Sequence, residues 1–153
     1  MLRNLRDQFF LTFFCVSRIM DSMNEENTAV KPKVLLVEDN ETFRKVIKNA
    51  MMIEGFEVYE AENGQLGLDA ALKHHPDLMV IDLYMPVMDG MKMLGAIKAN
   101  DILRAIPVLM VTNVQEELEN AVKHGAEEAL LKTSLTPRQL IEVCRKHLSD
   151  KSK

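Results

Sequence analysis

The 153-residue chain carries 19 Lys and Arg residues against 23 Asp and Glu residues, a formal net charge of −4, with both signs mixed along its length. A chain of this size can bury about two-thirds of its unfolded surface, so one core suffices. The charge pattern offers no field that would attract DNA or anionic lipid, so we expect neither direct nucleic-acid binding nor a membrane protein. The two cysteines, Cys15 and Cys144, show no metal-ligand spacing, which favours a reduced, cytoplasmic setting.

Residues 1–30 differ in composition from the rest and are expected to be an extension to the folded domain, which we place at residues 31–150. Four of the six phenylalanines lie between Phe9 and Phe14. The apolar stretch is too short to span a bilayer, which needs about 20 apolar residues. Three interpretations stay open: a helix that docks on a partner or a membrane surface, a disordered tail, or a leader translated from upstream of a true start at Met20 or Met23.

From Lys33 onward, short β-rich runs alternate with helix-like segments bounded by Gly, Pro and capping residues. In chain order the expected elements are a strand at 34–37, a helix that starts after Asn40 and stops at Gly55, a strand at 56–59, a helix at 65–74, a strand at 78–81, a helix at 90–100, a strand at 107–111, a helix at 116–124, a weak strand at 129–131 and a last helix from Pro137.

Two helices carry clear local signals. Asn40 is a good cap for the first helix, and the last helix combines Thr136 as cap, Pro137 at its first position and Gln139 completing a capping box. The first helix is expected to bury one face, which consists of Phe43, Val46, Ile47, Ala50 and Met51.

Five strands that alternate with five helices imply right-handed crossovers and a parallel sheet covered on both faces. The predicted fold is α/β, a doubly wound five-stranded parallel sheet of the flavodoxin-like kind with strand order 2-1-3-4-5. In this arrangement the carboxyl ends of all five strands face one rim, where ligands bind in such folds.

Polar residues follow the expected strands at this rim. Glu38 and Asp39 follow the first strand, Asp82 the third, Thr112 the fourth and Lys132 the fifth. The first and third strands are neighbours in the expected order, so three carboxylates should share one pocket. Two such charges repel by about 4 kcal/mol at a separation near 4 Å and an effective dielectric near 20. The pocket therefore calls for a cation.

A hard, oxygen-only ligand set predicts Mg²⁺, held by Glu38, Asp39, Asp82 and the backbone carbonyl of Tyr84. The Lys132 ammonium and the hydroxyl of Thr112 would suit an incoming phosphoryl group, whose charge must be neutralised during transfer. A carboxylate in such a site can itself be the nucleophile and form an aspartyl phosphate. We select Asp82 for this role, because Glu38 and Asp39 are better used to hold the metal.

Several segments, in order and at suitable spacing, resemble those of a two-component response regulator receiver domain: Val34–Asn40, Val80–Pro86, Met88–Gly90, Thr112, and Gly125-Ala126 ahead of Lys132. The resemblance runs from about Lys33 to Leu148. It implies Mg²⁺-dependent phosphoryl transfer from a histidine kinase or a histidine phosphotransfer protein onto Asp82, followed by slow self-dephosphorylation. It implies no other catalysed reaction.

The chain departs from the receiver pattern on both sides of Lys132. Thr133 follows the lysine where receivers usually have proline, so the loop into the last helix is expected to differ. Ala129 stands where many receivers carry a tyrosine or phenylalanine that changes rotamer together with the threonine, and an alanine cannot do so. Tyr84 and Val114 are expected to shield an aspartyl phosphate from water and to prolong its life.

The chain ends shortly after Leu148, so we expect no output domain and a role carried out by docking to an unknown downstream protein, through the last two helices and the fifth strand. A stand-alone phosphorylation switch or phosphorelay carrier is the leading hypothesis. The alternative is a receiver-like adaptor whose docking is largely independent of phosphorylation. A flavodoxin-like or phosphatase-like enzyme is disfavoured, because Glu38 and Asp39 would repel a flavin phosphate and Tyr84 stands where a phosphatase needs a second aspartate.

Overall fold

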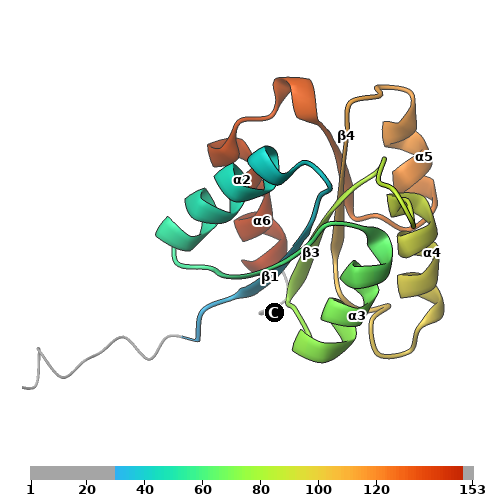
Figure 1. Cartoon of the computed structure of the whole chain (residues 1–153), viewed down its shortest axis with the longest axis horizontal. Helices are drawn as coiled ribbons and strands as arrows, with labels where there is room; N and C mark the ends of the chain where they lie inside the picture. Colours follow the sequence, from blue (N-terminus) through green and yellow to red (C-terminus); the bar gives the residue numbers. More distant parts are fainter. Residues whose placement is uncertain (1–29, 150–153) are drawn as a thin grey trace, which may run out of the picture. The chain divides into compact units, whose positions relative to one another are not determined.

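Strands and helices alternate through residues 30–149, the part of the chain that the computed structural model describes (Figure 1). The strands are β1 (Lys33–Val37), β2 (Glu57–Ala61), β3 (Leu78–Asp82), β4 (Val108–Thr112) and β5 (Glu128–Leu131). The helices are α2 (Glu41–Ile53), α3 (Gly64–His74), α4 (Gly90–Ala99), α5 (Glu117–Lys123) and α6 (Pro137–Ser149), with a 3₁₀ turn at Lys132–Ser134. The interpretations of the phenylalanine-rich segment and of the two start sites lie outside the described residues.

The five strands form one parallel sheet in the order β2-β1-β3-β4-β5, which confirms the predicted fold class. The register aligns the strand ends: Val37 lies opposite Ile81, Asp82 opposite Val111, and Thr112 opposite Leu131. The residues that follow β1, β3, β4 and β5 therefore emerge at the same edge of the sheet.

Helices cover both faces of the sheet, with α2 and α6 on one side and α3, α4 and α5 on the other (Figure 1). Because side chains alternate along a strand, each strand supplies both layers of core. Val34 and Leu36 of β1 pack into the cluster that includes α2 and α6, whereas Leu35 and Val37 pack into the cluster that includes α3 and α4. The central strands β3 and β4 are buried at every position, which explains their uninterrupted apolar sequences.

The capping residues act as the sequence predicts. The Asn40 side chain accepts a hydrogen bond of 2.9 Å from the Phe43 N–H at the start of α2. At the start of α6 the Thr136 hydroxyl accepts from the Gln139 backbone N–H at 3.2 Å, and the Gln139 side-chain oxygen Oε1 accepts from the Thr136 backbone N–H at 2.9 Å. This reciprocal pair is a capping box.

Two expectations about α2 and the strand that follows it are wrong. Val46 is 51% exposed and does not belong to the buried face of α2. The second strand begins at Glu57 rather than Phe56. Phe56 instead completes the end of α2, where its N–H donates to the Met51 carbonyl while the N–H of Gly55, at φ 91°, donates to Met52. These two bonds form a Schellman motif. Phe56 is therefore part of the helix terminus and not of the following strand.

Within residues 30–149, no helix combines the length and the apolar character needed to cross a membrane.

Candidate functional site

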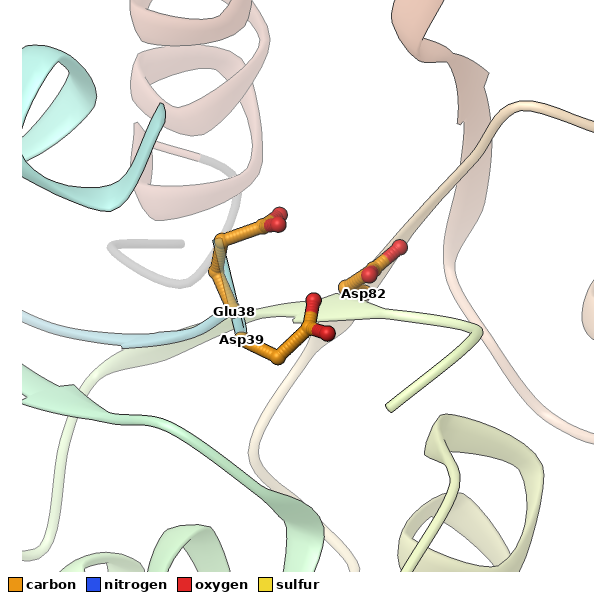
Figure 2. Close-up of side chains that lie close together, drawn as sticks. All are labelled: Glu38, Asp39 and Asp82. Carbon is orange, nitrogen blue, oxygen red and sulfur yellow. The ribbon is translucent and has the colours of Figure 1, made fainter. Parts of the chain in front are cut away.

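Three carboxylates converge at the carboxyl edge of the sheet, as the sequence predicts (Figure 2). Glu38 and Asp39 follow β1 directly and Asp82 is the last residue of β3. Each residue offers a carboxylate oxygen, and these atoms lie within 4.8 Å of one another. Glu38 and Asp82 are buried and Asp39 is exposed. The Glu38 N–H donates to the Ala61 carbonyl at 3.0 Å, which fixes the first acid against the end of β2.

The side chain of Lys132 bridges two of these acids. Its Nζ lies 2.7 Å from Glu38 Oε2 and 3.0 Å from Asp82 Oδ1. The lysine follows β5 and begins the 3₁₀ turn Lys132–Ser134. Only 12% of its side chain is exposed, so solvent screens these two ion pairs little.

The pKa values of Glu38, Asp82 and Lys132 are shifted by burial and by the contacts between these residues. Burial raises the pKa of Glu38, and it raises the pKa of Asp82 even though the hydrogen bond from Lys132 opposes the shift. Burial alone would lower the pKa of Lys132, but its bonds to Glu38 and Asp82 outweigh that effect and raise it. The ammonium is therefore firmly charged, whereas three carboxylates face one cation. The excess negative charge favours a further cation.

Thr112 is positioned beside the acids by β4, the neighbour of β3 in the sheet. Its side chain is buried, and its hydroxyl oxygen accepts a hydrogen bond of 3.1 Å from the Val114 N–H. The hydroxyl proton is therefore available for a second partner. Asn113, the next residue, is exposed and lines a cavity of about 280 Å³ together with Glu38, Asn40, Phe43, Lys132 and Thr133.

The segment after Asp82 is anchored by its backbone on both sides of Tyr84. The Leu83 N–H donates to the Val111 carbonyl at 2.9 Å, and the Gly90 N–H donates to the Leu83 carbonyl at 2.8 Å. A β-carbon at Gly90 would overlap the Asp82 carbonyl oxygen, so the start of α4 approaches the site only with glycine at this position. The side chain of Tyr84 is 54% exposed.

The same loop contains a strained turn. Val87 has a φ of 67°, and the Met88 N–H donates to the Pro86 carbonyl at 2.8 Å, which is the hydrogen bond of a γ-turn centred on Val87. A β-branched residue rarely adopts a positive φ. The Met88 carbonyl in turn accepts from the Gly64 N–H at 3.1 Å, so the start of α3 holds the loop in place.

Two residues at the site were not singled out from the sequence. Arg44 donates from Nη1 to the Glu38 carbonyl at 2.6 Å, and the Phe43 ring lies beneath the Lys132 ammonium at 5.1 Å from Nζ to the ring centroid. From the sequence we expected Phe43 to pack in the core, and we predicted no role for Arg44. Their place in the first turn of α2, three and four residues after the cap Asn40, is the signal that would have put them at this rim.

The residues present fit a magnesium site. The cluster offers carboxylate oxygens from three side chains, a hard donor set without the nitrogen or sulfur ligands that zinc prefers. One of its members, Asp39, is open to solvent, which leaves room for the water ligands that Mg²⁺ retains.

Comparison with known proteins identifies this arrangement. Residues 34–145 match the family described as the response regulator receiver domain. The chain belongs to this family. Receivers are signalling domains of two-component systems that bind Mg²⁺ at an acidic pocket and interact with histidine kinases or phosphotransfer proteins and with downstream targets.

Individual receivers resemble the chain over most of their length. The polar-differentiation response regulator DivK of Brucella anthropi is 32% identical over 118 residues, which cover 76% of this chain and 96% of the relative. The solved structure of the chemotaxis response regulator CheY4 of Vibrio cholerae superposes with a TM-score of 0.72 at 28% identity, covering 77% of this chain and 99% of that one. The solved structure of a response regulator receiver domain protein from Clostridium thermocellum superposes with a TM-score of 0.70 at 29% identity. The match covers 79% of this chain and 97% of that one.

Proposed function

We propose that Asp82 is the phosphoacceptor of this receiver and that residues 31–150 form the phosphorylated domain. The observation that carries the proposal is the convergence of Glu38, Asp39 and Asp82 on one rim with the Lys132 ammonium between two of them. A buried acid at a strand end, paired with a single cation and crowded by other acids, is costly to the fold and is therefore a candidate functional group.

In the proposed reaction an Asp82 carboxylate oxygen attacks the phosphorus of a phosphohistidine on a kinase or phosphotransfer protein. The phosphorus–nitrogen bond breaks and the imidazole leaves, so that an aspartyl phosphate forms. Lys132 then donates to a phosphoryl oxygen, and the Thr112 hydroxyl donates to another. Mg²⁺, held by Glu38, Asp39, Asp82 and the Tyr84 carbonyl, would neutralise charge on the phosphoryl group.

The proposed output is docking to a downstream protein through α5, β5 and α6. Ala129 of β5 is partly buried and packs against the core cluster on the α3–α5 side of the sheet. A side chain without rotamers cannot report the state of the site by turning inward or outward. We therefore propose that movement of Thr112 and Lys132, which end β4 and follow β5, carries the signal to this face.

A receiver-like adaptor that docks without phosphorylation is the second candidate, because Ala129 and Thr133 depart from the receiver pattern. Beryllofluoride, which mimics a phosphoryl group on aspartate, separates the two. With Mg²⁺ and beryllofluoride, the phosphorylation switch predicts new amide NMR positions for Asp82, Thr112 and Lys132 that extend into α5, β5 and α6. Asp82→Asn is the control and should give none. An unchanged wild-type spectrum would favour the adaptor.

A further inference from the structure

The aromatic ring of Phe43 occupies an unusual place for a residue at the edge of the core. It projects from the first turn of α2, is partly buried against the cluster that includes α6, and carries the Lys132 ammonium 5.1 Å from its centroid. The separation is within the roughly 6 Å over which an ammonium is attracted to the face of an aromatic ring. The ring and the lysine both line the cavity beside Glu38.

Besides the Phe43 ring, the Lys132 side chain contacts the two acids of the site. Its backbone belongs to a three-residue 3₁₀ turn, closed by the Leu135 N–H that donates to the Lys132 carbonyl at 3.2 Å. Its ammonium is held by Glu38 and Asp82, the same acids that the proposed chemistry gives to a metal ion and to the phosphoryl group. A contact of Lys132 that does not involve these two acids would persist when they bind the metal ion and the phosphoryl group.

We propose that Phe43 is a positioning residue, whose ring holds the Lys132 ammonium at the rim through a cation–π contact while Asp82 and Glu38 are engaged elsewhere. The inference rests on the proposed function of Asp82. The ring is a neutral anchor, so it neither competes with the phosphoryl group for the metal nor leaves a charge behind when Lys132 turns toward a phosphoryl oxygen.

The position of the ring supports this role over simple packing. An aliphatic side chain at position 43 would also be apolar but would offer the ammonium no negative face. Phe56 is a natural comparison, since the Arg145 guanidinium lies over its ring at 5.8 Å, on α6 and away from the acids. It provides the same type of contact without any link to the site.

The first measurement needs neither metal nor phosphate. A methylene group above an aromatic ring is shielded by the ring current, so the Lys132 Hε protons of the metal-free protein should resonate upfield of those of an exposed lysine such as Lys92. The shift should vanish in Phe43→Leu and persist in Phe43→Tyr. An ordinary Lys132 resonance in the wild-type protein would overturn the proposal.

The second measurement separates electrostatics from packing. Site-specific incorporation of mono-, di- and trifluorophenylalanine at position 43 keeps the shape of the ring but progressively weakens its negative face. The rate of Asp82 phosphorylation by phosphoramidate with Mg²⁺ should fall stepwise, and in Phe43→Leu by about 2- to 30-fold. The same series at Phe56 should leave the rate unchanged. Rates independent of fluorination at position 43 would overturn the positioning role.

The two measurements also distinguish this inference from the proposed function. If no variant and no wild-type protein is phosphorylated, the function of Asp82 is refuted, and Phe43 then has no reaction to assist. If the wild-type protein is phosphorylated but the fluorinated series is flat, the function stands and the role of Phe43 fails.

Discussion

Lys132 Nζ lies 3.0 Å from Asp82 Oδ1, although the strand that Asp82 ends and the strand that Lys132 follows are not neighbours in the sheet. Asp82 ends β3, Lys132 follows β5, and β4 lies between them. The lysine side chain is long enough to reach across the end of β4, where Thr112 stands. This one contact therefore links the proposed phosphoacceptor to the edge strand of the proposed docking face.

Replacement of this lysine should strengthen metal binding and weaken the metal-free fold. In Lys132→Met, the carboxylates of Glu38 and Asp82 lose the one basic side chain within residues 30–149 that forms ion pairs with them, so the metal-free protein should lose about 1–3 kcal/mol of unfolding free energy. Mg²⁺ should bind several-fold more tightly, because it no longer competes with an ammonium. Urea unfolding and calorimetric titration measure these two effects.

The matched control for that variant is Lys92→Met, which removes an exposed lysine paired with Asp89 at 3.2 Å. Exposed pairs of this kind contribute about 0–1 kcal/mol, so stability and Mg²⁺ affinity should hardly change. Equal Mg²⁺ affinity in the wild-type protein and Lys132→Met would show that Lys132 does not share its acids with the metal.

The pH dependence of stability follows from the raised pKa of Asp82 and of Glu38. As pH rises, the unfolded chain loses these protons first, so the metal-free folded state loses stability from the ordinary carboxyl range up to the raised folded values. Asp82→Asn removes one of the two groups. At pH 7 without metal it should be more stable than the wild-type protein by roughly 0.5–2 kcal/mol.

The difference between the wild-type protein and Asp82→Asn should shrink at low pH, where Asp82 is protonated in both the folded and the unfolded chain. Comparing the two proteins cancels the opposite contributions of Asp89 and Glu128, whose pKa values are lowered by their hydrogen-bond partners. A destabilised Asp82→Asn at pH 7 would mean that the ion pair to Lys132 outweighs the cost of burying the acid.

Tyr84 should control how long the aspartyl phosphate survives. Its side chain is exposed and lies two residues after Asp82 in the sequence, so we expect it to hinder a water that attacks the aspartyl phosphate. Tyr84→Asn should shorten the lifetime of phosphorylated Asp82, and Tyr84→Phe, which keeps the ring, should not. Loss of radiolabelled phosphate over time reports the rates. An unchanged lifetime in Tyr84→Asn would rule out shielding by this residue.

Val87 should be a site where glycine stabilises the protein. Its positive φ costs about 1–3 kcal/mol, whereas glycine loses only about 0.5–1 kcal/mol in additional chain entropy. The side chain is 82% exposed, so little packing is lost. Val87→Gly should therefore gain about 1 kcal/mol, seen as a higher urea midpoint at the same slope. Val87→Ala keeps the unfavourable φ and should remain less stable than Val87→Gly.

The fold and the rim were predictable because strong, local signals agree with one another. The apolar run that ends on Asp82 marks a central strand, and Asn40, Thr136 and Gln139 mark where two helices begin. Once the strand order follows from the alternation, parallel pairing brings Glu38, Asp39 and Asp82 together without any knowledge of distances.

The predictions fail where the local sequence allows two conformations or two environments for a residue and only tertiary contacts decide between them. Val46 and Phe43 are both apolar residues of one amphipathic helix, and only packing shows that one is exposed and the other lies under Lys132. Phe56 looks like a strand residue but completes a helix terminus. The γ-turn at Val87 contradicts the intrinsic preference of valine, so no propensity could predict it.

Intact-mass analysis after incubation with acetyl phosphate and Mg²⁺ tests the central claim most directly. The wild-type protein should gain the mass of a single phosphoryl group, borohydride trapping and peptide mapping should locate it at Asp82, and Asp82→Asn should gain none. Wild-type protein that stays unmodified, or a phosphoryl group that persists at another residue in Asp82→Asn, would contradict the assignment of Asp82 as the phosphoacceptor.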